Sequence, residues 1–480
     1  MTAATGGPAP NHQVPDDHVI VLFGAGGDLA RRKLLPGLFH LAGAGLMPDR
    51  FRIIGTSRRE RSDDDFRALA RSAIGDDAAD PEAWARFAAC LSSAPFRLEE
   101  TEPLERAVER AERELGGSTR RLHYLSVPPG AAGELVQAIG DCGLAEDARV
   151  ILEKPFGTDL DSALSLNRLV NDVFPEERVF RIDHFLGREA VQNLIALRFA
   201  NGMFEPIWNR NHIDHVQIDV PETLAVDARA GFYEQTGAYR DMVVTHLFHV
   251  LGFVAMEPPT SLAANAVGEE SRKVFRAIEP IRPDDVIRGQ YDGYREEAGV
   301  DEDSQTETFV AARVTIENWR WTGVPFFLRT GKRLTEQQRL LTIVFREPPR
   351  RMFEVTEALV EDFGPDHITF NLSDPGGIAA SFLAKVPGPS MRLGQARMQF
   401  SSEQTFGTTG VLQPYERLMY DAMTGDRTLF TDAEGIERLW TASAPLLHDP
   451  PPLQRYAPGT WGPHAMHELI APRRWRLSAT

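Results

Sequence analysis

Cysteine is scarce in this chain, with only Cys90 and Cys142 among 480 residues. A disulfide framework or a cysteine-rich metal site needs more thiols, so the sequence excludes both. The histidines lack the spacing of metal ligands, and the G-x-S-x-G motif of serine hydrolases is missing. We therefore expect no metal site, and we expect the two thiols to be buried in a protein of the reducing cytoplasm.

Long apolar runs are missing as well. No stretch reaches the roughly 18 apolar residues that a transmembrane helix needs, so no membrane span is expected. Residues 1–16 are rich in Gly, Pro, Thr and Asn and contain no apolar segment of the signal-peptide type. We expect these residues to form a disordered tail.

Basic residues are outnumbered by acidic ones. Lys and Arg total 52 and Asp and Glu total 69, which gives a net charge of −17 at pH 7. This charge argues against nucleic acid or an anionic membrane as the main partner. An anionic substrate would need a local basic pocket. The length and the 42% hydrophobic share are those of a globular protein with more than one domain.

The N-terminal part begins with a strand, a glycine turn and a helix. His18–Phe23 is a short run typical of a buried strand, and apolar residues recur at helical spacing after the turn. The turn itself, G-A-G-G-D-L, is a variant of the dinucleotide-binding fingerprint in which Leu29 replaces the third glycine. Its candidate cofactor-binding residues are Gly24, Gly27, Asp28 and Leu29.

The end of the second strand predicts which nicotinamide cofactor is bound. Phe51–Thr56 reads as this strand, and Ser57, Arg58 and Arg59 follow it. A site for NAD has Asp or Glu here for the ribose 2′-hydroxyl, whereas an arginine accommodates the 2′-phosphate of NADP. Arg58 therefore favours NADP. The alternative is a solvated basic cluster.

Strands and helices alternate through the rest of this part, which predicts a parallel, doubly wound sheet of the Rossmann type. Strands are expected at residues 122–127 and 150–152, and Lys154 follows the second one. Ligands of such sheets lie at the carboxyl ends of the strands. Lys154 is therefore a candidate site residue, with a simple surface lysine as the alternative.

Beyond Asp183 the pattern changes. Alternating runs at 216–220, 306–316, 340–345, 367–372 and 378–386 are separated by turns, and one long helix over Ala238–Ala255 interrupts them. These runs predict a large, mainly antiparallel sheet. We expect a Rossmann domain over residues 17–183 and a β+α domain over 184–480, an α/β unit followed by an α+β unit.

The stretch R-I-D-H-F-L-G-R-E, residues Arg181–Glu189, lies where these two parts meet. It precedes a helical pattern, and unpaired amides at a helix start favour anions. His184 and Arg188 add donors there, and Asp183 can orient an imidazole. The stretch predicts a pocket for a phosphorylated substrate beside a general base. A helix cap with surface charges is the alternative.

These motifs resemble those of the glucose-6-phosphate dehydrogenase family, and the resemblance covers nearly the full chain. They are Gly24–Leu29, Glu153–Gly157, Arg181–Glu189, Arg240–Leu247, Val324–Lys332, Tyr415–Phe430 and Trp461–Pro463. The resemblance implies a coenzyme domain joined to a β+α domain that dimerises through its sheet, and so a homodimer or homotetramer. It implies NADP-dependent oxidation of β-D-glucose 6-phosphate at C1 to 6-phosphogluconolactone, the first step of the oxidative pentose phosphate pathway.

The resemblance also implies roles for single residues. His246 matches the general base and Asp183 its carboxylate partner. Gly24, Gly27 and Arg58 match positions that bind coenzyme phosphate, and Lys154 matches a lysine between substrate and nicotinamide. The substrate site would comprise Lys154, His184, Arg188, Glu222, Glu234, Lys332 and Gln337, with the two glutamates on sugar hydroxyls and His184 and Lys332 on the phosphate.

Four positions depart from the family's pattern. Phe185 replaces a tyrosine, Arg188 a lysine, Glu234 an aspartate and Gln337 a basic residue. Arginine keeps the charge of lysine but changes its geometry. The departures leave substrate affinity open rather than the class of reaction.

Three alternatives remain open at this point. On chemistry alone His249 is as eligible as His246, which shares an apolar helix face and is typical of a core residue. The protein could instead be a dehydrogenase of free sugars of the glucose–fructose oxidoreductase kind, which lacks D-H-x-L-G and the R-T-G-K lysine. It could also be an NADP-binding regulatory paralogue without turnover, as Phe185, Arg188 and Gln337 suggest.

Overall fold

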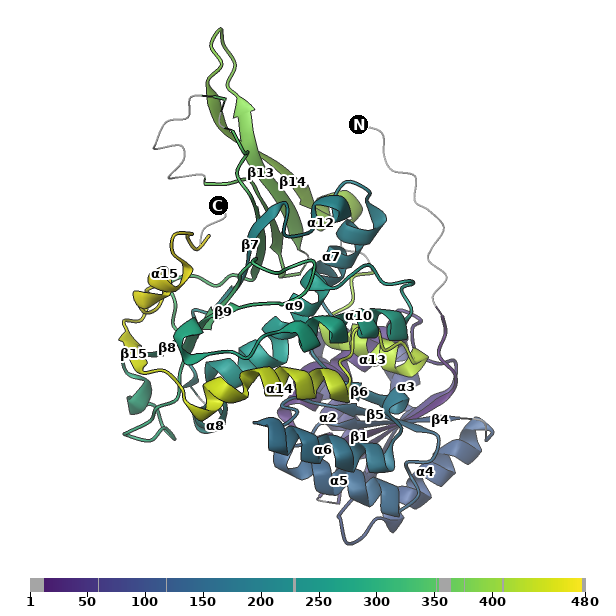
Figure 1. The fold of residues 1–480 in the computed structure, drawn as a ribbon. Helices are drawn as coiled ribbons and strands as arrows, with labels where there is room; N and C mark the ends of the chain where they lie inside the picture. Colours follow the sequence, from purple (N-terminus) through teal and green to yellow (C-terminus); the bar gives the residue numbers. More distant parts are fainter. Residues whose placement is uncertain are drawn as a thin grey trace. The chain divides into compact units, whose positions relative to one another are not determined.

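The computed structural model describes residues 13–58, 60–117, 119–227, 230–350, 352–353, 364–374, 376–407 and 410–476. The chain forms two compact units (Figure 1). Unit 1 comprises Met1–Lys154, Ser165–His184 and Leu412–Asp432, and unit 2 comprises Pro155–Leu164, Phe185–Val411 and Ala433–Thr480. The crossing at residues 184–185 lies beside the predicted boundary. Two short segments, 155–164 and 412–432, belong to the unit opposite to the one the sequence suggested.

The predicted disordered tail is only partly within the described residues, because 1–12 lie outside them. Residues 13–16 are tied to unit 1, which corrects the prediction for this part. The carbonyl of Gln13 accepts a hydrogen bond of 2.8 Å from the Tyr420 hydroxyl. Asp16 forms an ion pair of 3.5 Å with Arg120.

Unit 1 is built on a six-stranded parallel sheet in the order β3-β2-β1-β4-β5-β6. Its strands are β1 (His18–Phe23), β2 (Phe51–Ser57), β3 (Leu91–Pro95), β4 (Arg120–Leu125), β5 (Ala148–Leu152) and β6 (Val179–Arg181). The central strand β1 is buried along its whole length, which explains its continuous apolar run. The Rossmann-type parallel sheet is confirmed.

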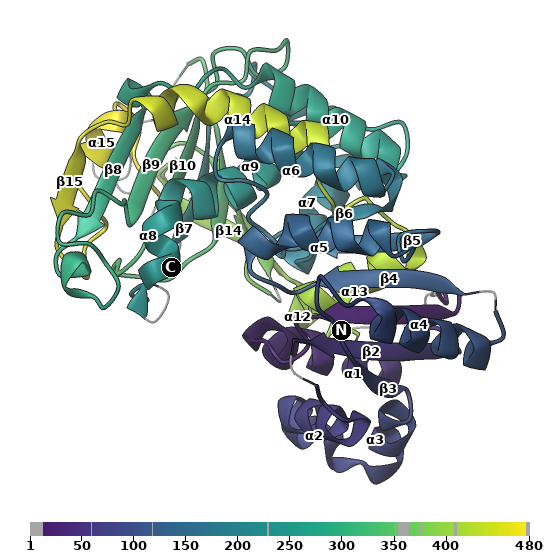
Figure 2. The same ribbon diagram turned by 90° about the horizontal axis from the view of Figure 1, so that it is seen from below.

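Several helices of unit 1 contain a proline in their first turn. The helices are α1 (Leu35–Gly43), α2 (Asp63–Ile74), α3 (Pro81–Ala88), α4 (Glu102–Leu115), α5 (Pro129–Asp141), α6 (Leu160–Val173), which spans both units, and α13 (Pro414–Thr424). Proline stands in the first turn of α1, α3, α4, α5 and α13, where its missing N–H has no helical partner to lose. Helix α4 packs against β1, β2 and β3 (Figure 2).

Unit 2 contains a nine-stranded sheet in the order β14-β13-β12-β11-β7-β10-β9-β8-β15. Its strands are β7 (Ile213–Pro221), β8 (Val286–Tyr291), β9 (Phe309–Val314), β10 (Phe326–Gly331), β11 (Leu340–Phe345), β12 (His367–Asn371), β13 (Gly377–Lys385), β14 (Leu393–Ser401) and β15 (Leu453–Tyr456). The β7–β10 and β8–β15 pairs are parallel and the other described pairs are antiparallel. Figure 1 shows β13 and β14 as a long hairpin, and Figure 2 shows β15, β8, β9 and β10 in sequence. The mainly antiparallel sheet is confirmed, although the predicted runs omitted β8, β10, β14 and β15.

The helices of unit 2 are more numerous than predicted. They are α7 (Glu189–Ala200), α8 (Ala230–Ala238), η6 (Tyr239–Leu247), α9 (Phe248–Ala255), α10 (Ala264–Ala277), α12 (Ser402–Phe406), α14 (Ala433–His448) and α15 (Ala465–Ile470). Four of them, α8, η6, α9 and α10, lie between β7 and β8. The prediction of a single interrupting helix was wrong, because α10 is amphipathic and separated from α9 by a short loop that the apolar pattern does not reveal.

The predicted helix over Ala238–Ala255 consists of two segments of different pitch. Tyr239–Leu247 forms the π-helix η6, and an α-helix follows from Phe248. Nearly all of its residues are buried on every side. The apolar pattern therefore cannot distinguish an α-helix, in which each amide bonds to the carbonyl four residues earlier, from a π-helix, in which it bonds to the carbonyl five residues earlier. π-Helical turns occur frequently at functional sites, and this one carries His246.

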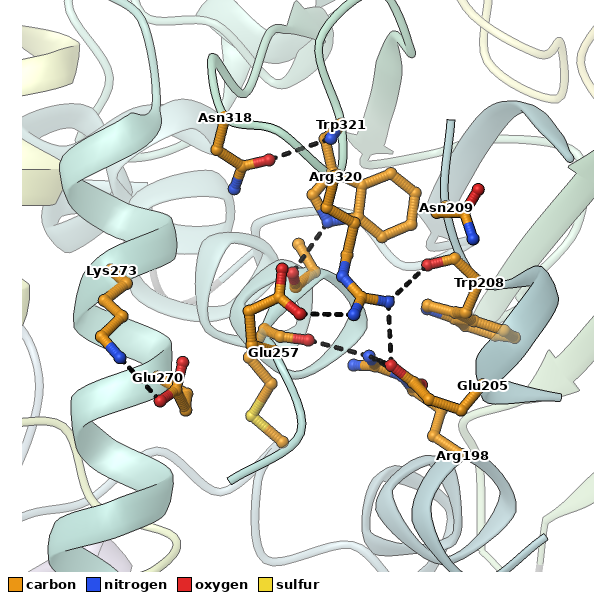
Figure 3. A network of polar contacts seen from close by, with 12 residues as sticks. Arg198, Glu205, Trp208, Asn209, Glu257, Glu270, Lys273, Asn318, Arg320 and Trp321 are labelled. Carbon is orange, nitrogen blue, oxygen red and sulfur yellow. Dashed lines mark hydrogen bonds and ion pairs between the residues drawn. The ribbon is translucent and has the colours of Figure 1, made fainter. Parts of the chain in front are cut away.

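A polar network fixes the end of α9 (Figure 3). Arg198 of α7 is fully buried and donates to the carbonyls of Phe253, Val254 and Met256, at 2.8–3.1 Å. These are carbonyls that the end of a helix leaves without a partner. Glu205 compensates the buried charge through an ion pair of 3.0 Å with Arg198.

Residues from two further loops complete this network (Figure 3). Arg320 pairs with Glu205 at 2.8 Å and also with Glu257. The indole N–H of Trp208 donates to Val254 and that of Trp321 to Ala255, each at 2.8 Å. The network joins α7 to α9, the helices that follow the Arg181–Glu189 stretch and η6.

Two remaining predictions from composition concern the membrane and the thiols. Within the described ranges, none of the helices has the length and apolar character needed to cross a membrane. Cys90 and Cys142 are free thiols and only half-buried, so the prediction of buried thiols was wrong. Cys90 lies just before β3 and Cys142 just after α5, at ends of elements where the chain reaches the surface.

Candidate active site

The turn after β1 can be built only with glycine at Gly24. Its φ is +77°, and a Cβ on this residue would lie 2.1 Å from the carbonyl oxygen of Ser126. The Gly27 amide donates to the Gly24 carbonyl at 2.8 Å, and the Ala25 amide donates to Thr56 at 3.1 Å. The turn is thereby tied to the ends of the neighbouring strands β2 and β4.

A cavity of about 670 Å³ lies beside this turn, within unit 1. This volume is within the usual range for small-molecule sites. It is lined by the carboxyl ends of β1, β2 and β4, with Gly24, Gly27 and Arg58 among the lining residues. Arg61, which the sequence analysis did not single out, lies close enough that its guanidinium would contact a Cβ at Gly26 at 3.4 Å. The cavity therefore joins a glycine turn to the two arginines of its lining, Arg58 and Arg97.

Three of the predicted cofactor residues do not line this cavity: Asp28 and Leu29 in the turn, and Lys154 after β5. Asp28 is exposed and pairs with Arg32 at 3.5 Å. Leu29 is half-buried and precedes the short π-helix η1 (Ala30–Leu34). Sequence pattern alone could not separate Asp28 and Leu29 from the glycines, because all four belong to one continuous turn.

A second group of side chains gathers at the carboxyl ends of β4 and β5. Glu153 accepts a hydrogen bond of 2.5 Å from the Tyr124 hydroxyl. Burial raises the pKa of Glu153 to about 7, against the lowering effects of Tyr124 and Lys154, while Asp183 raises it further. Burial and the charge of Glu153 raise the pKa of Tyr124 well above its usual value. The motif E-K-P contained this residue, but only Lys154 was given a role.

Asp183 and His184 follow the carboxyl end of the edge strand β6, which pairs with β5. Asp183 is 2% exposed. The His184 ring stacks on Tyr415 with centroids 6.0 Å apart and planes 8° apart. Burial, then Glu153 and Asp183, raise the pKa of Tyr415. Tyr415 comes from α13, far along the chain, so only folding reveals its place.

Unit 2 contains His246, which is completely buried in η6. Its ring stacks on Phe185, with centroids 4.4 Å apart and planes 19° apart. The guanidinium of Arg188 lies 5.5 Å from the same phenyl ring. His249 instead packs against Phe275, with ring centroids 6.2 Å apart. His246 is thus the histidine of this helix that contacts the D-H-x-L-G stretch.

Glu222 and Lys332 form an ion pair in unit 2. Strands β7 and β10 are parallel neighbours with Pro221 opposite Gly331, so the next residue of each strand lies beside the other. The Lys332 ammonium also lies 5.8 Å from the ring centroid of Tyr233. Sheet register therefore brings together an acid and a base that the resemblance assigned separately to sugar and phosphate.

Three further predicted substrate residues occupy different surroundings in unit 2. Glu234 accepts a hydrogen bond of 2.9 Å from the Tyr294 hydroxyl. Arg188, the residue before α7, pairs with Asp374 at 3.1 Å. Gln337 is exposed in the loop between β10 and β11. Asp374 gave no sequence signal, because its partner Arg188 lies far away in the sequence, at the N-cap of α7.

Comparison with known proteins covers both units. Residues 21–193 match the family model "Glucose-6-phosphate dehydrogenase, NAD binding domain", and residues 195–476 match "Glucose-6-phosphate dehydrogenase, C-terminal domain". The chain is 39% identical to a glucose-6-phosphate 1-dehydrogenase of Rhizobium meliloti, over 95% of this chain and 96% of that protein. It is 37% identical to glucose-6-phosphate 1-dehydrogenase 2 of Mycobacterium bovis, over 95% and 94%.

Solved structures agree with this similarity. A glucose-6-phosphate dehydrogenase in complex with its substrate glucose 6-phosphate superposes with a TM-score of 0.89 at 31% identity, covering 97% of this chain and 99% of that one.

Proposed function

We propose that this chain, which belongs to the glucose-6-phosphate dehydrogenase family, oxidises β-D-glucose 6-phosphate at C1 to 6-phosphogluconolactone with NADP. The observation that carries the proposal is that both units match that family, at 95% coverage of this chain. Such a match covers the Rossmann sheet and the nine-stranded sheet together.

The cavity beside the glycine turn fits the cofactor. A turn that excludes any Cβ at Gly24 lets a pyrophosphate approach the backbone, and Arg58 in the cavity lining supplies positive charge for a 2′-phosphate, with Arg61 beside Gly26. A dinucleotide held there would supply the acceptor for the hydride that leaves C1. The chain's contribution is to hold the dinucleotide and to place the sugar.

The proton of the C1 hydroxyl must leave as C1 is oxidised. His246 is proposed as the base, because an imidazole titrates near neutral pH and its buried ring is held in one orientation by Phe185. Asp183 is proposed to fix its tautomer and to stabilise the imidazolium, as in other carboxylate–histidine pairs.

The substrate itself would be held by the polar residues of the predicted substrate site. Lys332, His184 and Arg188 are proposed for the phosphate, and Glu222 and Glu234 for sugar hydroxyls, with Lys154 near the reacting carbon. The pairing of Lys332 with Glu222 supports a site in which acid and base lie together. Gln337 contributes a neutral contact at most.

One spectrophotometric assay of NADPH formation tests the reaction against its two alternatives. Turnover of glucose 6-phosphate, with little or none of free glucose, supports the proposal. Turnover of free glucose alone would indicate a dehydrogenase of non-phosphorylated sugars. Cofactor binding without turnover of either would indicate the regulatory paralogue.

Arg58 tests the preference for NADP. Arg58→Ala should raise the KM for NADP at least about tenfold, because a charge-assisted contact to the 2′-phosphate is lost. The KM for NAD, which has no such phosphate, should change little. Initial rates with each cofactor measure both values, and an equal change in the two would contradict the assignment.

We also propose that the enzyme works as a homodimer or homotetramer in the cytoplasm. Large apolar side chains stay exposed around the β13–β14 hairpin, including Met391, Met398 and Phe406. Exposed apolar surface of this kind is typical of an interaction site. Sedimentation velocity of the purified protein tests the assembly, and a monomer at micromolar concentration would contradict it.

A further inference from the structure

The start of α7 is the place where the sequence predicts an anion-binding site, and a side chain of the chain itself lies there. Helix α7 begins at Glu189, and Arg188 at its N-cap makes no capping hydrogen bond with its side chain. Asp374, from the loop between β12 and β13, places its carboxylate Oδ2 at 3.1 Å from the Arg188 guanidinium. All of these residues belong to unit 2.

The helix start acts on the same carboxylate. Burial raises the pKa of Asp374, while Arg188 and the amides of Ala190 and Glu189 lower it. Within the described chain, Asp374 Oδ1 is nonetheless buried without a hydrogen bond of ordinary geometry. The carboxylate therefore lies near the groups that favour an anion, but one of its two oxygens, Oδ1, accepts no hydrogen bond of ordinary geometry from the described residues.

The backbone holds this loop close to the helix. Gly376 has a φ of +75°, and a Cβ on it would lie 2.8 Å from the Cβ of Ala190. Only glycine permits so close an approach at this φ. The position of Asp374 is thus set by packing between the loop and α7 as well as by the ion pair.

A substrate phosphate needs the groups that Asp374 faces. The guanidinium and the first-turn amides would favour a dianionic phosphate more strongly than a singly charged carboxylate, since the charge is larger and three oxygens can accept. Arg188 cannot serve both anions in full. Its pairing with Asp374 reduces what it can offer to a phosphate.

We propose that Asp374 is a specificity-determining residue, whose carboxylate competes with the substrate's phosphate for Arg188 and for the start of α7. The inference rests on the proposed function, in which Arg188 is part of the phosphate site. The carboxylate sets a threshold: a phosphorylated sugar displaces it, and weaker anions do not. Removing the charge strengthens phosphate binding, whereas a residue that only positioned Arg188 would weaken it when removed.

The decisive variant is Asp374→Asn, which keeps the shape and removes the charge. It should lower the KM for glucose 6-phosphate by about two- to fivefold, the size expected for a partly exposed charge pair. Asp284→Asn is the matched control, because it removes one negative charge from an exposed site of the same unit. It should leave the KM unchanged. A rise in KM for Asp374→Asn, or no change, would overturn the inference.

Binding of inorganic phosphate, measured by calorimetry, separates this inference from the proposed function. The Kd for inorganic phosphate should be lower in Asp374→Asn than in wild type by a similar factor. This difference should be largely lost when Arg188→Ala is also present. If wild-type protein does not turn over glucose 6-phosphate, the function fails while the phosphate titration still tests Asp374. Should Asp374→Asn not fold, Asp374→Ser carries the same expectation, and a Kd that does not fall in it would refute the competition.

Discussion

At the scale of single residues, His246 is completely buried and stacked on a phenyl ring, which is unusual for a group that must exchange a proton. His246→Asn keeps a polar side chain of similar size but removes the base. We expect turnover to fall by roughly two to four decades, with both KM values little changed. Asp183→Asn should cause a smaller loss, because it disturbs the orientation of the base and leaves the base itself.

His249→Asn is the control for this experiment, since His249 is also buried on the same helix but packs against Phe275. It should keep turnover within a few-fold of wild type. Steady-state kinetics with glucose 6-phosphate and NADP decide the matter. Near-normal turnover in His246→Asn would remove His246 from the mechanism.

Lys332 offers a second test at this scale. Lys332→Ala removes a charge-assisted contact to the phosphate, which contributes about 1.5–3 kcal/mol. The KM for glucose 6-phosphate should therefore rise on the order of ten- to a hundredfold. Any weak activity on free glucose should change much less, because that sugar has no phosphate.

The Lys332→Ala variant also breaks an ion pair, and a control for that loss is needed. Lys332 pairs with Glu222, so its removal leaves a half-buried carboxylate without its partner. Lys273→Ala removes a lysine that pairs with Glu270 on the exposed face of α10, and should not affect the KM. Equal losses on both sugars in Lys332→Ala would show that Lys332 is structural and that the phosphate binds elsewhere.

At the scale of elements, the β1 turn is the most constrained segment of the predicted site. Gly24→Ala would place a methyl group 2.1 Å from the Ser126 carbonyl at a φ of +77°. We expect the turn to move, the KM for NADP to rise by more than about tenfold, and stability to fall by about 1–3 kcal/mol. Urea unfolding and initial-rate kinetics measure the two effects.

Gly45→Ala is a matched control in the same unit. Gly45 has a φ of +69°, but nothing lies within 4 Å of the Cβ it would gain. The control therefore carries the backbone strain without the steric clash. A rise of equal size in the NADP KM of both variants would indicate a general loss of structure and not a site at the turn.

At the scale of the whole molecule, the stability should depend on the protonation of Glu153. Its pKa of about 7 in the folded protein lies above the usual value of 4.5, so the folded state binds this proton more tightly than the unfolded state. The contribution of Glu153 to the free energy of unfolding is fully present below about pH 4.5 and is lost as the pH rises through 7. Between pH 4.5 and pH 8, the free energy of unfolding of Glu153→Gln should therefore rise relative to that of wild type by on the order of 1–3 kcal/mol.

Chemical unfolding of wild type and Glu153→Gln at several pH values measures this difference. Glutamine can still accept the hydrogen bond from Tyr124, so the comparison isolates the charge. Glu336→Gln, at an exposed position, should show no such pH dependence. A stability difference that is constant across this range would show that Glu153 does not titrate near neutrality.

Much of the fold could be read from the chain because the relevant signals are local. The buried strand at residues 18–23, the glycine turn after it and the alternating runs after Asp183 each follow from the period of apolar residues and from backbone freedom at glycine. The family could be identified for the same reason, since D-H-x-L-G and its companion motifs are continuous segments. These features predicted both sheets and the class of reaction.

Only the tertiary structure could decide which side chains meet. Tyr415 stacks on His184, Lys332 pairs with Glu222, and Asp374 pairs with Arg188, in each case through register or packing between segments far apart in the sequence. The π-helical pitch of η6 was equally hidden, because a segment buried on all sides has no periodicity to read. Sequence by itself determined the Rossmann part, the strand-rich part after Asp183 and the motifs that carry the chemistry, since those depend on neighbouring residues. The partner of each charge depends on how the elements pack, and that was settled only in three dimensions.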